Sequence, residues 1–423
     1  MGNPANMERV TSGKLARVTR NTRHETRSND SSEEVSVRYR GLFWLAFGAL
    51  GALGFVWGTF AVLLADLSRS LDISPGPLGL ALSGGMVASF PVMALAGRVA
   101  DRAGRRPLLI VSGASMGIGF AWLAFVESYA SLFAALLALS ATSGAYDIGV
   151  NAVAMDYERA TGRRRMAVIH AAFSAGGAIG ALLAGALITA GVNFRLVYLA
   201  ALVPLGAMVL VATNSRFPPV AFSQARSEAR LYKNLPLLLV ALVAALAFFS
   251  EATMEHWSGI YLRNTLALPV LVGASGVAVY HASMASGRLV SAGIISRFGN
   301  RLTLRAAGLL AATGMALALT TRGSVLVVCG FLVVGLALSA VVPIALSVAG
   351  SMLPERAGAA SSVVTTMGYC GFLLGPILIG VLAEILSLHA ALGVVVIVGI
   401  SIAALASTFG EPQPPEETRS WEE

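Results

Sequence analysis

The chain has 423 residues, of which 56% are hydrophobic and 12% are charged, and it carries a formal net charge of +8. Its mean hydropathy is +0.75. This composition excludes a soluble globular protein, because the surface of such a protein needs many more polar side chains.

Residues 1–40 form the first distinct segment. They contain no apolar core, and they carry eight basic residues, at positions 9, 14, 17, 20, 23, 27, 38 and 40. A polar, basic segment of this kind predicts a disordered tail and not a signal peptide.

Twelve apolar blocks follow the tail. Each is close to or above the length of about 20 residues that a helix needs to cross a bilayer, and none shows the alternating polarity of a barrel strand. They lie at 41–66, 77–97, 107–126, 131–155, 167–190, 193–213, 235–262, 269–295, 303–321, 324–350, 358–386 and 388–409. The sequence therefore predicts an all-α membrane protein with twelve transmembrane helices.

A short and densely charged loop separates the second and third blocks. It reads Gly97-x-x-x-Asp101-Arg102-x-Gly104-Arg105-Arg106. Charges this dense lie in water, so the segment is predicted to be a tight turn at the membrane surface. The loop resembles the signature loop of the major facilitator superfamily, a family of solute transporters.

This resemblance implies two pseudo-symmetric six-helix bundles with the substrate between them near the midplane. It also implies that Asp101 contacts the N-terminus of the eleventh span, near Gly358, and latches the outward-open state. Unpaired amides and the helix dipole favour a carboxylate at that end. Arg102, Arg105 and Arg106 can reach carboxylates or lipid phosphates. The alternative is a generic basic loop that obeys the positive-inside rule.

First spans line the cavity in this family, so Trp57 in the first block is a candidate to stack on a ring-bearing substrate. Packing against a neighbouring helix is the alternative.

The fourth and fifth blocks contain ionisable residues at membrane depth, where such groups are costly and usually mark a pathway or a pair. Asp147 and Asn151 are four residues apart and share a helix face, and His170 is predicted to lie at a similar depth. With Glu158, the pattern resembles a bacterial subgroup of the superfamily that includes the rhizopine-associated membrane protein. Asp147 and His170 are either a proton-responsive pair or a structural polar clamp.

The polar segment 214–234 divides the spans six and six. An offset of 195 residues carries the turn 101–106 onto 296–301, with Ser296 in place of the acid. The same offset carries the glycines of the fifth span onto those of the eleventh, namely Gly176, Gly180 and Gly185 onto Gly371, Gly375 and Gly380. A shared offset predicts a duplicated architecture, with bundles at 41–213 and 235–409, a cytoplasmic linker at 214–234 and an acidic tail at 410–423. The glycines suit close helix packing.

The seventh and eighth blocks carry the remaining candidates. Glu251 and Glu255 share a helix face, and two carboxyl groups this close in a low dielectric are expected to retain one proton. The alternative for Glu255 is solvation at the outer interface. His281 is a candidate ligand for substrate or a proton, and Arg288, on the same face, binds an anionic substrate or ties its helix to a neighbouring carboxylate.

Basic residues lie mainly on one side of the predicted helices. The other side holds only four of them, Arg69, Arg195, Arg263 and Arg322. The positive-inside rule therefore predicts that both termini are cytoplasmic, in a bacterial cytoplasmic membrane. Anionic lipid headgroups are the expected partners of these arginines, so the net charge does not require nucleic acid.

These features predict a secondary transporter that moves a small organic solute by alternating access, coupled to protons. The alternatives are a proton-independent uniporter and a non-transporting membrane sensor on the same scaffold. The chain has no phosphate-binding loop, and its five histidines lack metal-ligand spacing. No enzyme activity, metal or cofactor is therefore expected, and the protein is expected to act as a monomer. The identity of the solute and the direction of transport stay open.

Overall fold

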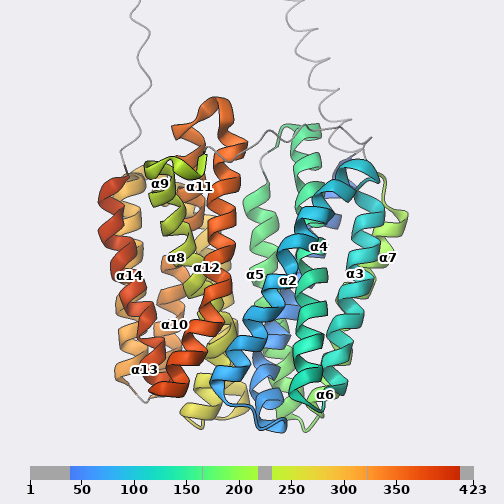
Figure 1. Cartoon of the computed structure of the whole chain (residues 1–423), viewed down its shortest axis with the longest axis vertical. Coiled ribbons are helices and arrows are strands. Elements are labelled where there is room, and N and C mark those ends of the chain that lie inside the picture. The colour runs from blue at the N-terminus through green and yellow to red at the C-terminus, as the bar shows by residue number, and fades with distance from the viewer. Residues whose placement is uncertain (1–38, 164, 218–230, 322, 410–423) are drawn as a thin grey trace, which may run out of the picture.

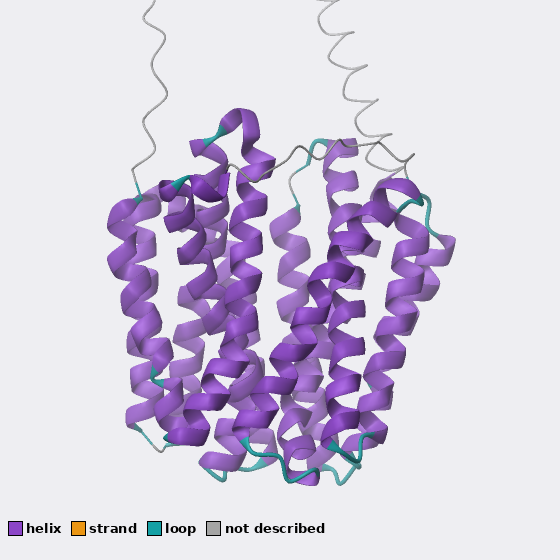
Figure 2. Cartoon of the chain, viewed as in Figure 1, coloured by secondary structure: helices purple, strands orange, loops and turns teal. Residues whose placement is uncertain are grey.

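The computed structural model describes residues 39–163, 165–217, 231–321 and 323–409. Within these ranges the chain is helical and has no strand (Figure 2). Eleven helices are long and apolar enough to cross a membrane, which confirms the prediction of an all-α membrane protein. The predicted tails, apart from their residues nearest the helices, and residues 218–230 of the predicted linker lie outside the described residues.

The first six spans form one bundle, on the right in Figure 1. Asparagine and serine side chains cap two of its helices, because Ser128 accepts from the backbone N–H of Ser131 and Asn193 from that of Arg195. Its helices are the first helix (Tyr39–Ser70), α2 (Pro75–Arg102), α3 (Arg105–Trp122), α4 (Tyr129–Thr161), α5 (Met166–Thr189), α6 (Phe194–Ala200) and α7 (Leu202–Asn214). Helices α6 and α7 together make one span.

The last six spans form the second bundle, on the left in Figure 1. One helix of 51 residues holds two predicted spans, because Gly299 interrupts its helical geometry with a φ of 73°. The described chain therefore contains all twelve predicted spans. The helices are α8 (Leu235–Ile260), a π-helical turn (Tyr261–Thr265), α9 (Val270–Thr320), α10 (Ser324–Leu338), α11 (Val341–Met352), α12 (Ala357–Ile385), α13 (Leu388–Leu392) and α14 (Val394–Leu405).

The two bundles repeat the same backbone turn. Gly104 has a φ of 92° and Gly299, at the predicted offset of 195 residues, has a φ of 73°. Both values lie in the left-handed region that side chains with a Cβ rarely adopt. The second charged turn is thus the structural counterpart of the first, although it lacks the acid.

Glycines also pack the same pairs of helices in each bundle. A Cβ on Gly176 of α5 would lie 2.0 Å from the carbonyl oxygen of Gly51 in the first helix. A Cβ on Gly371 of α12 would lie 2.0 Å from the carbonyl oxygen of Ala245 in α8. Only glycine permits backbones to approach this closely, so the predicted packing role of these glycines is confirmed.

Contacts between the bundles are concentrated at one end of the helices. We call the end of the helices that holds Tyr39 and Phe409, the first and last described residues, the terminal side, and the other end the opposite side. The terminal side lies at the top of Figure 1. At the opposite side, Gly185 meets Ala274 and, at the equivalent positions, Gly380 meets Gly79. Towards the terminal side of α2, a Cβ on Gly97 would meet no described atom within 4 Å.

Polar groups reinforce this contact at the opposite side. The backbone N–H of Gly76 donates to Glu384 at 2.9 Å. Arg263 forms a bidentate ion pair with Asp66, with one N–O distance of 2.7 Å, and its side chain is only 3% exposed. Each contact joins one bundle to the other, so all of them must break if this side opens.

Candidate functional site

Arg288 of α9 lies between the bundles near the middle of the helices. Its Nη2 donates to Oε1 of Glu251 in α8 at 3.1 Å, and its Nη1 donates to Oγ of Ser174 in α5 at 2.8 Å. The side chains of Arg288 and Glu251 are 19% and 13% exposed. Arg288 therefore ties its helix to the neighbouring carboxylate of Glu251 and also reaches the other bundle through Ser174. A role in binding an anionic substrate stays a prediction.

Glu255 lies one helical turn from Glu251 and is only 3% exposed. It does not reach a solvated interface, so the alternative considered for it from the sequence is wrong. Within the described residues no hydrogen bond or ion pair satisfies its carboxyl group. An ionised carboxylate in such surroundings is costly, and this makes Glu255 chemically distinct from Glu251.

Asp147 of α4 meets the other bundle through Tyr369 of α12. The Tyr369 hydroxyl donates to one carboxylate oxygen at 3.1 Å, and the Asn151 amide donates to the other at 3.0 Å. The ring of Tyr369 also stacks on that of Phe248, with centroids 6.0 Å apart. No hydrogen bond between the described residues joins Asp147 to His170, so the pair expected between these two residues is not seen in this conformation.

His281 is buried on α9 directly against α5. A Cβ on Gly177 would lie 2.9 Å from the imidazole, and the rings of Phe173 and Tyr280 lie beside it. Within the described residues its Nε2 has no hydrogen-bond partner. The ring is therefore held in place by packing, with one polar nitrogen left unsatisfied.

Trp57 is fixed in the first helix by its indole N–H, which donates to Ser143 at 3.1 Å. Its ring also makes edge contacts with Phe60 and His256. These contacts place Trp57 at the junction of the bundles, where it packs against neighbours; stacking on a ring-bearing substrate stays a prediction.

The charged loop between α2 and α3 is organised around Arg105. Its guanidinium lies 3.0 Å from Asp156 of α4 and 3.5 Å from Asp101. Arg106 donates to the backbone carbonyl of Ser215 and covers the ring of Phe217. Asp101 is 43% exposed and is paired within its own bundle, so the latch to α12 is not formed in this conformation and stays a prediction for the outward-open one.

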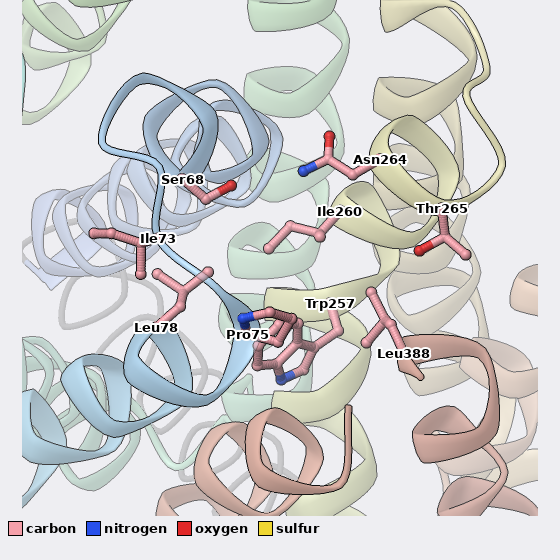
Figure 3. A pocket seen from close by; sticks show the side chains of 9 residues that line it. All are labelled: Ser68, Ile73, Pro75, Leu78, Trp257, Ile260, Asn264, Thr265 and Leu388. Atoms are coloured by element: carbon pink, nitrogen blue, oxygen red, sulfur yellow. The ribbon is translucent and has the colours of Figure 1, made fainter. Parts of the chain in front are cut away.

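A crevice of about 200 Å³ lies at the opposite side, lined by residues such as Ser68 of the first helix and Asn264 of the π-helical turn (Figure 3). Its apolar walls come from both bundles. Leu78 of α2 belongs to the first bundle, and the second bundle contributes Trp257, Ile260 and Leu388. Asn264 and Thr265 of the π-helical turn form an exposed polar rim. The crevice thus depends on the closure of this side.

Three partners in this site were not anticipated from the sequence: Ser174, Tyr369 and Tyr280. Ser174 and Tyr369 occupy equivalent positions at the 195-residue offset, and each contacts a charged residue of the opposite bundle. The duplication is thus the signal that could have identified them. Within the described residues, no group of three histidine, cysteine, aspartate or glutamate side chains could hold a metal ion.

Comparison with known families agrees with this architecture. The model of the Major Facilitator Superfamily matches residues 45–371 and 278–423, which together span most of the chain. The chain belongs to the major facilitator superfamily. The family predicted from the loop at 97–106 is therefore confirmed, and membrane transport is the activity that this membership supports.

Relatives are similar over nearly their whole length. An uncharacterized MFS-type transporter of Yersinia pestis is 29% identical over 375 residues, covering 89% of this chain and 95% of that protein. Membrane protein MosC of Rhizobium meliloti is 28% identical over 371 residues, covering 85% and 89%. The similarity to MosC agrees with the bacterial subgroup that the Asp147 pattern indicated.

Solved structures share the fold at low sequence identity. The nucleoside transporter NupG aligns with a TM-score of 0.70 at 17% identity, covering 86% of this chain and 97% of that chain. A bacterial homolog to the human lysosomal transporter Spinster aligns with a TM-score of 0.75 at 16% identity, covering 89% and 99%. These likenesses establish the major facilitator fold.

Proposed function

We propose that this superfamily member is a secondary active transporter, which moves a small organic solute by alternating access and couples that movement to protons. The observation that carries the proposal is the charged group between the bundles. Arg288 is held by Glu251 of its own bundle and Ser174 of the other, with the buried carboxyl of Glu255 one turn away. Ionisable groups at this depth are costly and usually mark a transport pathway.

Two further features support alternating access. The described polar contacts between the bundles run from the middle of the helices to the opposite side, as with Asp147–Tyr369 and Asp66–Arg263. Basic residues gather on the terminal side, which favours a cytoplasmic location for it in a bacterial inner membrane. The conformation is then closed to the outside and parted towards the cytoplasm.

The test starts from a thermal-shift screen of a metabolite library on the purified protein. A hit is then measured as labelled solute in counterflow with proteoliposomes. Exchange across the membrane supports a transporter, and saturable binding without exchange would instead support a membrane sensor.

Proton coupling is tested in the same proteoliposomes with a pH-sensitive dye. Solute-dependent proton movement is expected in the wild type and is expected to be lost in Glu251→Gln and Asp147→Asn. Solute transport that is unchanged after collapse of the pH gradient would identify a proton-independent uniporter. Unchanged proton flux in both variants would remove these residues from the coupling site.

A further inference from the structure

The three buried carboxyl groups between the bundles differ in the donors that they receive. Both oxygens of Asp147 accept hydrogen bonds, from Asn151 and Tyr369. Glu251 accepts a charged hydrogen bond from Arg288. Glu255 accepts none within the described residues, although it is the most deeply buried of the three.

This difference separates their chemistry. A carboxylate that accepts two hydrogen bonds or an ion pair is stabilised in its ionised form. A carboxylate on a nearly buried side chain that receives no donor from the protein loses most of its hydration, so its neutral form is preferred. Two carboxyl groups one helical turn apart also repel each other when both are charged.

We propose that Glu255 carries the exchangeable proton of this transporter, and that Glu251 is the fixed counter-ion that positions Arg288. This division of roles rests on the proposed proton coupling and assigns it to one residue. The charged and titratable groups that face Glu255 are Glu251 on its own helix and Arg288 and Tyr280 on α9. Of these, only Arg288 is a cation, and Glu251 and Ser174 already bind it.

The contact with Ser174 couples this arrangement to the movement of the bundles. Ser174 belongs to the first bundle, so its hydrogen bond to Arg288 breaks when the opposite side opens. A guanidinium N–H is then free to turn towards Glu255, one turn along α8 from its present partner. The Glu255 O–H bond ionises, its proton passes to water at the opposite side, and the resulting carboxylate is stabilised by Arg288.

The direct test observes the proton without a solute. Infrared difference spectra of the purified full-length protein, recorded on a pH jump, report the C=O stretch of a protonated carboxyl group. We expect this band in the wild type, its loss in Glu255→Gln and its retention in Glu127→Gln, the control, whose side chain is 82% exposed. A band that persists in Glu255→Gln, that is absent from the wild type or that is lost in Glu127→Gln would overturn the assignment.

Two more variants test the roles of Ser174 and Glu251 with the same infrared band, so the assignment does not depend on the folding of Glu255→Gln alone. Ser174→Ala releases one N–H of Arg288 and is expected to weaken the band at neutral pH, and an unchanged band would overturn the coupling step. The double variant Glu251→Gln/Arg288→Met, which removes the fixed pair together, is expected to keep the band, and its loss would overturn the proposed role of Glu251.

Failure of this inference and failure of the proposed function are distinguishable. If the wild type moves solute without protons, the proposed coupling fails even where the infrared band identifies Glu255. If solute-driven proton flux persists in Glu255→Gln, coupling stands and the assignment to Glu255 fails.

Discussion

The two bundles share their packing but not their charge. Gly176 contacts a carbonyl of the first helix just as Gly371 contacts one of α8, and Gly185–Ala274 is repeated by Gly380–Gly79. A duplicated scaffold has kept the small residues that let its helices approach. The ionisable groups follow no such repeat.

Equivalent positions make the difference explicit. The carbonyl oxygens that these glycines contact, on Gly51 and Ala245, are 194 residues apart, so the first helix and α8 align at that offset. Helices α2 and α9 align at 195. The acidic and basic residues of the second bundle, Glu251, Glu255 and Arg288, therefore correspond to Trp57, Ala61 and Met93. Closure is thus a shared property of the bundles, and the proposed proton chemistry belongs mainly to the second one.

The largest expected effect is that of Glu251→Gln. It removes the present charged partner of Arg288 in a mostly buried site, which costs about 3–5 kcal/mol of stability. Thermal unfolding in detergent measures this cost, and Trp57→Phe at the equivalent position, which loses one hydrogen bond, is expected to cost about 1 kcal/mol. Glu251→Gln/Arg288→Gln is expected to regain most of the loss; a double variant no more stable than the single one contradicts this account.

Gly380→Ala is expected to have the next largest effect. Its Cβ would lie 2.6 Å from the carbonyl oxygen of Pro75, and crowding of this kind costs about 1–3 kcal/mol. Because the clash exists only while the opposite side is closed, the variant favours opening. In a background without Cys329 and Cys370, an impermeant maleimide should label Leu78→Cys faster.

The equivalent Gly185→Ala sharpens the comparison. Its Cβ would lie 2.3 Å from the Cβ of Ala274, so labelling should rise to a similar extent. Gly97→Ala is the control, since a Cβ there meets no described atom within 4 Å. Faster labelling in the control, or in only one of the two glycine variants, would argue against symmetric closure.

Ser83→Ala probes a feature that only one bundle has. Pro376 lies inside α12, and the Ser83 hydroxyl donates to the carbonyl of Leu373 at 2.7 Å while accepting from the N–H of Ile377 at 3.0 Å. Removing the hydroxyl leaves two part-buried backbone groups without this partner, at about 1–2 kcal/mol, and should also increase labelling of Leu78→Cys. The first bundle has Ala181 in place of the proline. Ala278→Ser, at the position equivalent to Ser83, should therefore not stabilise the closed side or slow the labelling of Leu78→Cys. Slower labelling in that variant would contradict the assigned role.

The charged turns give the smallest effect on stability. Asp101 is half-exposed and pairs with Arg105, so Asp101→Asn should cost at most about 1 kcal/mol. If the latch forms in the outward-open state, the counterflow rate falls while solute affinity stays near that of the wild type. Ser296→Asp supplies the missing acid to the second turn, and a rate change as large as that of Asp101→Asn would make the two turns equivalent.

Local sequence patterns carried most of the fold. Hydropathy locates each span because a helix needs a minimum apolar length to cross the bilayer. Gly104 and Gly299 mark the two turns because glycine adopts a positive φ without steric cost. The break at Gly299 was expected from the charges around it.

The site was less predictable because its contacts cross between bundles. The residue spacing placed Asp147 and Asn151 on one face, and their hydrogen bond is formed. Spacing within a helix cannot show how far a second helix is rotated, so Tyr369 and not His170 meets Asp147. Likewise, the sequence shows Asp66 and Arg263 only as single charged residues near the ends of two spans. They become a buried ion pair because the two bundles meet at the opposite side.

The central claim is that Glu255 of the second bundle carries the coupled proton while both bundles carry the solute. Simultaneous recording of labelled solute and pH in proteoliposomes of Glu255→Gln tests it most directly. We predict that counterflow of the solute continues and that solute-driven proton movement, present in the wild type, is lost. Proton movement that still accompanies the solute in Glu255→Gln would contradict the account.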